Sequence, residues 1–223
     1  MIQWVRGFVL RSEDRAEFDQ RLTLYTLECG KLSANILGVK KNVSKLRGLT
    51  LPFTEYRFQV YLHGGKRTGM RDPGKILGGE SLTHYSLLKE EWNRMIQASA
   101  ITEILNVLTQ PFYPNSTEYQ WLCTNFAQLE WTLHPQLVRC RFVLGLLKIL
   151  GYSLRSHSIW SSLSVAERTS LNQLARWDSQ SNLFSESEIF HLSELTQSYL
   201  NRYLPFPLKT SLFEKKCEMA SNY

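Results

Sequence analysis

The stretch "RLTLYTLECGKLSANIL", residues 21–37, decides the fold of the first part of the chain, because apolar and polar side chains alternate along it. A period of two is typical of strands that bury one face, and glycine in the central Cys29-Gly30 pair suits a tight turn. The stretch therefore predicts two strands joined by a turn. The apolar residues expected on their buried face are Leu22, Leu24, Leu32, Ala34 and Ile36.

The same alternation recurs on both sides of this stretch. It appears in "QWVRGFVLR" (residues 3–11), in "TEYRFQVYL" (54–62) and more weakly in "KRTGMRDPGKIL" (66–77). Five strands in about 80 residues without a strong helix favour a small antiparallel barrel or sandwich. An OB-type barrel is the natural candidate.

From about residue 81 the apolar spacing changes to the three-to-four repeat of helices. Two of the later helices begin with capping boxes, Ser164-x-x-Glu167 and Ser185-x-x-Glu188. The predicted fold class is therefore α+β multidomain. An N-terminal OB-fold β-barrel is expected at residues 1–80, and an all-helical C-terminal domain at residues 81–223.

Bulk properties exclude several classes of protein. The chain has 223 residues, and no apolar run reaches the roughly 18 residues needed to span a bilayer. The opening residues carry no export signal, so a cytoplasmic protein is expected. The four cysteines lie far apart without a C-x-x-C pair, which favours free thiols over a zinc site or disulfides.

The net charge of +6 belongs entirely to the first part of the chain. Residues 1–80 hold 14 Lys and Arg against 8 Asp and Glu, whereas residues 81–223 hold 12 of each. Four of the cations, Lys40, Lys41, Lys45 and Arg47, stand in "GVKKNVSKLRG", residues 38–48. Such a cluster of like charges either forms a solvated rim or holds a polyanion.

Aromatic residues on the predicted strands leave two interpretations open. Tyr25, Tyr56, Phe58 and Tyr61 could stack on nucleic-acid bases, or they could fill the core. For Tyr56 and Phe58, which alternate with polar residues, the core interpretation is favoured.

No motif for catalysis or metal binding appears. The five histidines show no H-x-x-x-H or H-E-x-x-H spacing, and the chain has neither a phosphate loop nor a G-x-S-x-G motif. We therefore expect a binding protein that is not an enzyme and has no metal or other cofactor.

An ordered set of motifs then resembles a known family. The set comprises W-x-R-G-x-V-L at residues 4–10, G-K-L-S at 30–33, P-F-T at 52–54, "RFVLGLLKILGY" at 141–152 and "YLNRYLPFPLKTSLF" at 199–213. In this order they resemble RecO, a family of bacterial DNA repair proteins that act as recombination mediators. Many members carry a four-cysteine zinc element after the L-G-Y, but residues 150–169 here contain no cysteine, so a zinc-free member is expected.

The resemblance implies that residues 1–80 form the DNA-binding domain and residues 81–223 the partner-binding domain of a nucleoid-associated protein. It implies a function without covalent chemistry. RecO proteins bind single- and double-stranded DNA, anneal complementary strands, and help load the recombinase RecA onto DNA coated by single-strand-binding protein. They act with RecR and recognise the acidic, apolar-ended tail of the single-strand-binding protein. The alternatives are an RNA-binding OB protein and a non-catalytic scaffold that acts through its helical domain.

Two sets of site residues follow. The phosphate contacts are expected at Lys40, Lys41, Lys45 and Arg47, extended by Lys31, Arg57, Lys66 and Arg67. The partner tail is expected on the helix with Arg139 and Arg141, whose apolar stripe contains Phe142, Leu146 and Leu150. The other interpretation of this helix is that the stripe is core and the arginines only border the surface.

Overall fold

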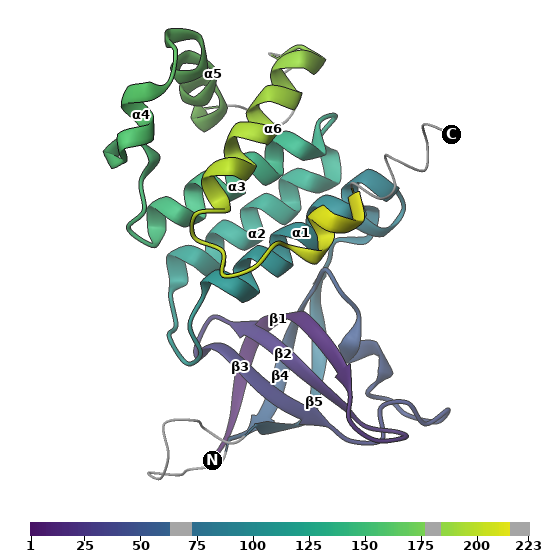
Figure 1. Ribbon diagram of the computed structural model, residues 1–223. Helices are drawn as coiled ribbons and strands as arrows, with labels where there is room; N and C mark the ends of the chain where they lie inside the picture. Colours follow the sequence, from purple (N-terminus) through teal and green to yellow (C-terminus); the bar gives the residue numbers. More distant parts are fainter. Residues whose placement is uncertain (63–72, 177–183, 215–223) are drawn as a thin grey trace. The chain divides into compact units, whose positions relative to one another are not determined.

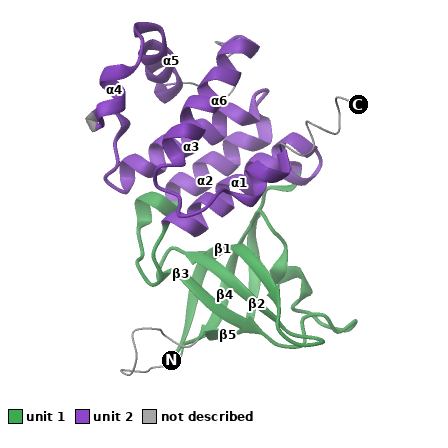
Figure 2. Ribbon diagram, viewed as in Figure 1, with its two compact units in different colours: residues 1–86, 109–119 green, residues 87–108, 120–223 purple. Residues whose placement is uncertain are grey.

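The computed structural model describes residues 1–62, 73–176 and 184–214, which form two compact units. The first unit comprises residues 1–86 and 109–119, and the second comprises residues 87–108 and the chain from residue 120 onward (Figure 2). The expected division of functions between residues 1–80 and residues 81–223 stays a prediction.

The first unit contains a closed five-stranded barrel (Figure 1). Its strands are β1 (Ile2–Asp14), β2 (Gln20–Thr26), β3 (Gly30–Ile36), β4 (Thr54–Tyr61) and β5 (Gly74–His84). They pair in the order β1-β2-β3-β5-β4, antiparallel throughout except between β3 and β5, and β1 closes on β4. A five-stranded barrel of this kind is typical of the OB fold. The predicted fold class is confirmed.

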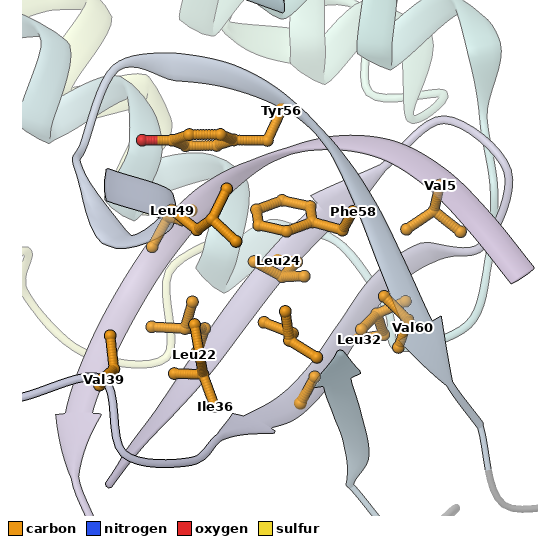
Figure 3. Close-up of a cluster of buried hydrophobic side chains, with 13 residues drawn as sticks. Val5, Leu22, Leu24, Leu32, Ile36, Val39, Leu49, Tyr56, Phe58 and Val60 are labelled. Atoms are coloured by element: carbon orange, nitrogen blue, oxygen red, sulfur yellow. The ribbon is translucent and has the colours of Figure 1, made fainter. Parts of the chain in front are cut away.

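The interior of the barrel is filled from alternating positions on the strands (Figure 3). Along β3, each second side chain is buried, and the residues between them face outward. Burial of these apolar side chains is the main stabilising contribution to such a barrel. The cluster consists of Val5, Val9, Leu22, Leu24, Leu32, Ala34, Ile36, Val39, Leu49, Tyr56, Phe58, Val60 and Ile76.

The last strand differs from the one expected at residues 66–77. The described part of β5 begins at Gly74 and continues to His84, seven residues beyond Leu77. Most side chains after Leu77 are exposed, so this half of the strand shows no apolar alternation. Its pairing with β4 also shifts register twice, which a pattern of period two does not reveal.

The labelled helices α1 to α6 and two 3₁₀ turns follow the barrel strands, and residues 209–214 are also helical. The labelled helices are α1 (Trp92–Leu108), α2 (Ser116–Trp131), α3 (Pro135–Ile149), α4 (Ser158–Ser162), α5 (Val165–Arg176) and α6 (Glu186–Leu200). The 3₁₀ turns are η2 (Ser86–Lys89) and η3 (Leu154–Ser156), and η1 (Arg47–Thr50) lies within the barrel unit. Helix α3 contacts α1, α5 and α6 and is therefore the centre of the helical unit. None of the helices in the described residues is long and apolar enough to cross a membrane.

Both predicted capping boxes are present. The Ser185 hydroxyl accepts a hydrogen bond from the Glu188 backbone N–H, and the Glu188 carboxylate accepts one from the Ser185 N–H. Ser164 and Glu167 form the same reciprocal pair before α5. Pro135 occupies the first turn of α3, where its missing N–H leaves no helical bond unmade.

The first unit also contains a second chain segment, residues 109–119, which is bonded to the barrel. The Tyr25 hydroxyl donates to Glu118 Oε2 at 2.5 Å, and the Tyr119 hydroxyl donates to Glu55 Oε1 at 2.7 Å. Burial, followed by the hydrogen bond to Glu118, raises the pKa of Tyr25 far above its usual value. These bonds join side chains that lie far apart in the sequence, so the segment is a structural part of the barrel unit.

Candidate nucleic-acid interface

The basic loop, residues 38–48, starts in a fixed position against the hairpin between β1 and β2. Gly38 has φ of 64°, a left-handed conformation that glycine adopts without a steric penalty. Its N–H donates to Asp19 Oδ1 at 2.7 Å, and the next bond runs from the Lys40 N–H to the Phe18 carbonyl at 3.1 Å. The loop is thus attached to a hairpin that precedes it in the sequence.

One of the four loop cations has an acidic partner. Lys40 Nζ lies 2.6 Å from Asp14 Oδ2, and this hydrogen bond holds the pKa of Asp14 below its usual value. The loop itself contains no acid, so the fold supplies the carboxylate from the end of β1. The charge of Lys40 is therefore already partly neutralised.

The other three loop cations are exposed. Lys41 Nζ lies 5.7 Å from the centre of the Phe18 ring, and Lys45 points into solvent. The Arg47 side chain donates to the Lys40 carbonyl at 3.2 Å, which orders the loop without a carboxylate. Lys41, Lys45 and Arg47 consequently carry most of the positive charge that this loop can offer to a phosphate.

The predicted extensions of the patch lie elsewhere on the barrel. Lys31 is half-buried at the beginning of β3, and burial lowers its pKa. The basic loop follows the end of the same strand, roughly 20 Å away for seven residues of β-structure. Arg57 is exposed on β4. Lys66 and Arg67 lie outside the described residues.

The aromatic residues of the strands divide into two groups. Tyr25, Tyr56 and Phe58 are at most 1% exposed, so they belong to the core and offer no ring to a ligand. The favoured core interpretation of Tyr56 and Phe58 is confirmed. Tyr61 is 37% exposed, and Trp4, which the sequence analysis did not single out, is 46% exposed.

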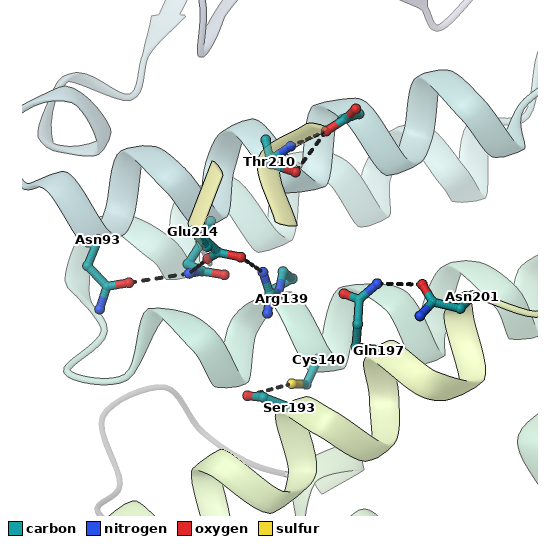
Figure 4. Close-up of polar contacts among 10 residues, drawn as sticks. Asn93, Arg139, Cys140, Ser193, Gln197, Asn201, Thr210 and Glu214 are labelled. Carbon is teal, nitrogen blue, oxygen red and sulfur yellow. Dashed lines mark hydrogen bonds and ion pairs between the residues drawn. The ribbon is translucent and has the colours of Figure 1, made fainter. Parts of the chain in front are cut away.

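In the helical unit, Arg139 has its own acidic partner. Its Nη1 donates to Glu214 Oε2 at 2.8 Å, and the same carboxylate accepts a hydrogen bond from Gln97 Nε2 at 2.8 Å (Figure 4). The two charged side chains are only 12% and 20% exposed. In this conformation Arg139 is engaged by the chain's own carboxylate.

Arg141 and Phe142 have different surroundings. Phe142 is fully buried, and its carbonyl accepts a hydrogen bond from Trp121 Nε1 at 3.1 Å. Arg141 is half-buried, donates to Gln128 Oε1 at 2.8 Å and holds its guanidinium 5.4 Å from the centre of the Trp121 ring. Of the three predicted tail residues, Arg141 is the one that borders a cavity.

That cavity, of about 370 Å³, lies within the helical unit among α2, α3, α4 and α5. Arg141, Lys148 and Arg155 give it three cations, and none of the described residues that line it is acidic. The apolar part of the wall consists of Trp121, Leu144, Leu154, Trp160, Leu171 and Leu174. An apolar wall with several cations suits a ligand that has both an apolar group and a carboxylate.

No metal site is formed in the part of the chain that the structure describes. Within residues 1–62, 73–176 and 184–214, no group of three or more His, Cys, Asp or Glu side chains could hold a metal ion. Among the described cysteines, Cys29, Cys123 and Cys140, no disulfide is formed. Burial raises the pKa of the Cys140 thiol and therefore disfavours its thiolate form.

These features define a class: an OB-fold protein whose barrel presents a basic loop and whose chain continues into a helical unit. Comparison with known families then identifies it. Residues 1–71 match the family described as "Recombination protein O N terminal", and residues 89–159 match "Recombination protein O C terminal". The chain belongs to the RecO family.

Similar proteins carry the same family name. The chain is 31% identical over 146 residues to the "DNA repair protein RecO" of Pelotomaculum thermopropionicum and 34% identical over 147 residues to that of Heliobacterium modesticaldum. The alignments cover 66% of this chain, and 54% and 50% of the two relatives. The chain thus spans about half the length of the relatives it matches.

Proposed function

We propose that this protein is a DNA-binding recombination mediator. In this role it binds single- and double-stranded DNA, anneals complementary strands, and helps load the recombinase RecA onto DNA coated by single-strand-binding protein, together with RecR. The function requires no covalent step. The observation that carries it is the exposed cation set of the basic loop on an OB-type barrel, in a chain of the RecO family.

The loop would act on the phosphate backbone. Lys41, Lys45 and Arg47 would release counterions when they contact phosphates, so affinity would fall with salt and depend little on sequence. A surface that neutralises phosphates also lowers the repulsion between two strands, which favours annealing. Lys40 would contribute less because of its ion pair with Asp14.

The cavity beside Arg141 would receive the acidic, apolar-ended tail of the single-strand-binding protein. Its apolar wall would seat the tail end, while Arg141, Lys148 or Arg155 would take a carboxylate. Arg139 is a weaker candidate than Arg141, because Glu214 already accepts its hydrogen bond.

Salt-dependent binding to fluorescent single-stranded DNA tests the first part of the proposal. We expect a clear loss of affinity with rising salt, and a charge-reversed loop (Lys41→Glu, Lys45→Glu, Arg47→Glu) should bind much more weakly at low salt. Undiminished binding by this variant would refute the assignment of the phosphate contacts to the loop. Competition with RNA of equal length distinguishes the proposal from the alternative of an RNA-binding protein, which predicts a preference for RNA.

A labelled tail peptide tests the cavity. Arg141→Ala should weaken peptide binding by about tenfold or more, because hydrogen bonds to charged groups contribute about 1.5–3 kcal/mol. Arg202→Ala is the matched control, since Arg202 is an exposed cation of the same unit that does not line the cavity. Equal affinity of the Arg141 variant and the wild type would refute the assignment.

A further inference from the structure

An exposed apolar surface lies on the outside of the barrel, where β1, β4 and β5 pair. We call it the outer aromatic face, and its members are Ile2, Trp4, Tyr61 and Leu77, which are between 37% and 56% exposed. Ile2 lies opposite Tyr61 in the β1–β4 register, and Trp4 lies two positions further along β1. Trp4 and Tyr61 are thus diagonal neighbours, about 7 to 8 Å apart in such a pairing.

Two arginines adjoin this face in an unusual arrangement. Arg6 and Arg57 are paired directly across β1 and β4, and both are exposed. Like charges directly opposite each other destabilise a sheet. Arg6 Nε lies 3.9 Å from Glu55 Oε1 and Arg57 Nη1 lies 3.5 Å from Glu80 Oε1, so neither ion pair is a short hydrogen-bonded one. A bound anion would relieve the repulsion between the two arginines.

The Arg57 guanidinium also lies 4.9 Å from the centre of the Trp4 ring. A guanidinium held over an aromatic ring places positive charge and a stacking ring within reach of one nucleotide. A nucleotide in a single strand offers the complementary groups, a flat base and a phosphate.

The basic loop ends next to β5, the strand that carries Leu77. Turn η1, which begins with Arg47 at the end of that loop, contacts β5. Leu49 of the turn reaches β5 from the interior of the barrel, because it belongs to the core and a Cβ added at residue 79 would lie 3.3 Å from Leu49 Cδ2. The next residue, Glu80, is the residue paired with Arg57 in the register. Arg47 and Arg57 are thus both linked to β5, Arg47 through its turn and Arg57 through strand pairing.

We propose that the outer aromatic face binds the bases of single-stranded nucleic acid, with Trp4 and Tyr61 as stacking platforms and Arg6 and Arg57 as phosphate contacts. The proposal rests on the proposed DNA-binding function and assigns it a second, base-dependent contact surface. A protein partner is a poorer occupant. Protein interfaces involve about 20 to 30 residues a side, whereas this face offers four apolar side chains beside two arginines.

The test compares two fluorescent single strands of equal length and charge, an oligothymidylate and an abasic phosphodiester strand. Trp4→Ala should lower affinity for the thymidylate strand by about tenfold, within the range found for loss of one stacking ring, and leave the abasic strand within twofold. Trp4→Phe, which keeps a ring, should restore most of the loss. Trp131→Ala is the matched control, because Trp131 is 67% exposed in the helical unit.

Unchanged thymidylate binding by the Trp4→Ala protein would overturn the proposal. An equal loss on both strands would overturn it as well, because the residue would then act without the bases. The charge-reversed loop variant distinguishes failure of this proposal from failure of the proposed function. It should weaken binding of both strands whether or not Trp4 stacks on a base. A thermal melt confirms that each variant is folded before its affinity is compared.

Discussion

Replacing Asp14 with asparagine should strengthen DNA binding, although most substitutions at a binding surface weaken it. The Asp14 carboxylate lies 2.6 Å from Lys40 Nζ, and the two side chains are 65% and 36% exposed. An amide of nearly the same shape removes the negative charge and leaves Lys40 available to a phosphate. Asp14 is not part of the barrel core, so the substitution should leave the fold unaffected.

The size of the effect follows from counterion release. One additional phosphate contact steepens the slope of log affinity against log salt by about 0.7 for a single strand. For a purely electrostatic contact this corresponds to a gain of about eightfold at 50 mM salt and about threefold at 200 mM. The gain should therefore shrink as salt rises.

Fluorescence anisotropy with a labelled single strand at four or more salt concentrations measures both quantities. Glu17→Gln is the control, because it removes a carboxylate from the same hairpin and leaves the Asp14–Lys40 pair in place. In a Lys40→Ala background the Asp14→Asn change should give no steeper slope. A slope unchanged from the wild type, or a gain that survives without Lys40, would refute the reasoning.

Three further substitutions test the helical unit through its stability. Arg139→Ala should lower the free energy of unfolding by about 3 kcal/mol in urea titrations, because it leaves the Glu214 carboxylate buried without its cation. Gly145→Ala should cost about 1–3 kcal/mol in the same assay, since the new Cβ would lie 2.4 Å from the Trp121 ring. Ser185→Ala should lower the stability of the unit by about 1 kcal/mol in a thermal or urea melt through loss of the helix cap.

Each of these has an outcome that contradicts it. Arg139→Met combined with Glu214→Leu should be close to wild-type stability, and a double variant as unstable as Arg139→Ala would show that burial of charge is not the cause. Gly78→Ala has open space around its Cβ and should change stability by less than about 0.5 kcal/mol. If it costs as much as Gly145→Ala, the clash with Trp121 is not the reason. An unaltered melt for the Ser185 variant would show that the cap contributes nothing.

The barrel could be predicted from the sequence because its information is local. Alternation along residues 21–37 marks the buried side chains, and in a strand these point to one face regardless of what surrounds them. The helix starts were equally local, since a capping box joins residues three apart, as at Ser185.

The environment of the basic loop could not be predicted, because it depends on a pairing between distant residues. Nothing near Lys40 in the sequence indicates that Asp14 reaches it. Trp4 shows a related difficulty. Trp4 alternates with Val5 along β1, so its position is compatible with the outer side of the barrel. Phe8 lies four residues further along and should point to the same side, yet it is fully buried against Tyr85. Only the packed structure distinguishes the two rings.

The barrel unit combines residues 1–86 with residues 109–119, and this has a consequence for synthesis of the protein. The five strands leave the ribosome before the segment that accepts the Tyr25 hydrogen bond at Glu118. At about 5 to 20 residues per second, the 33 residues from 86 to 119 take roughly 2 to 7 seconds to translate. During that interval the nascent barrel lacks its last segment, and all of α1 is made before that segment.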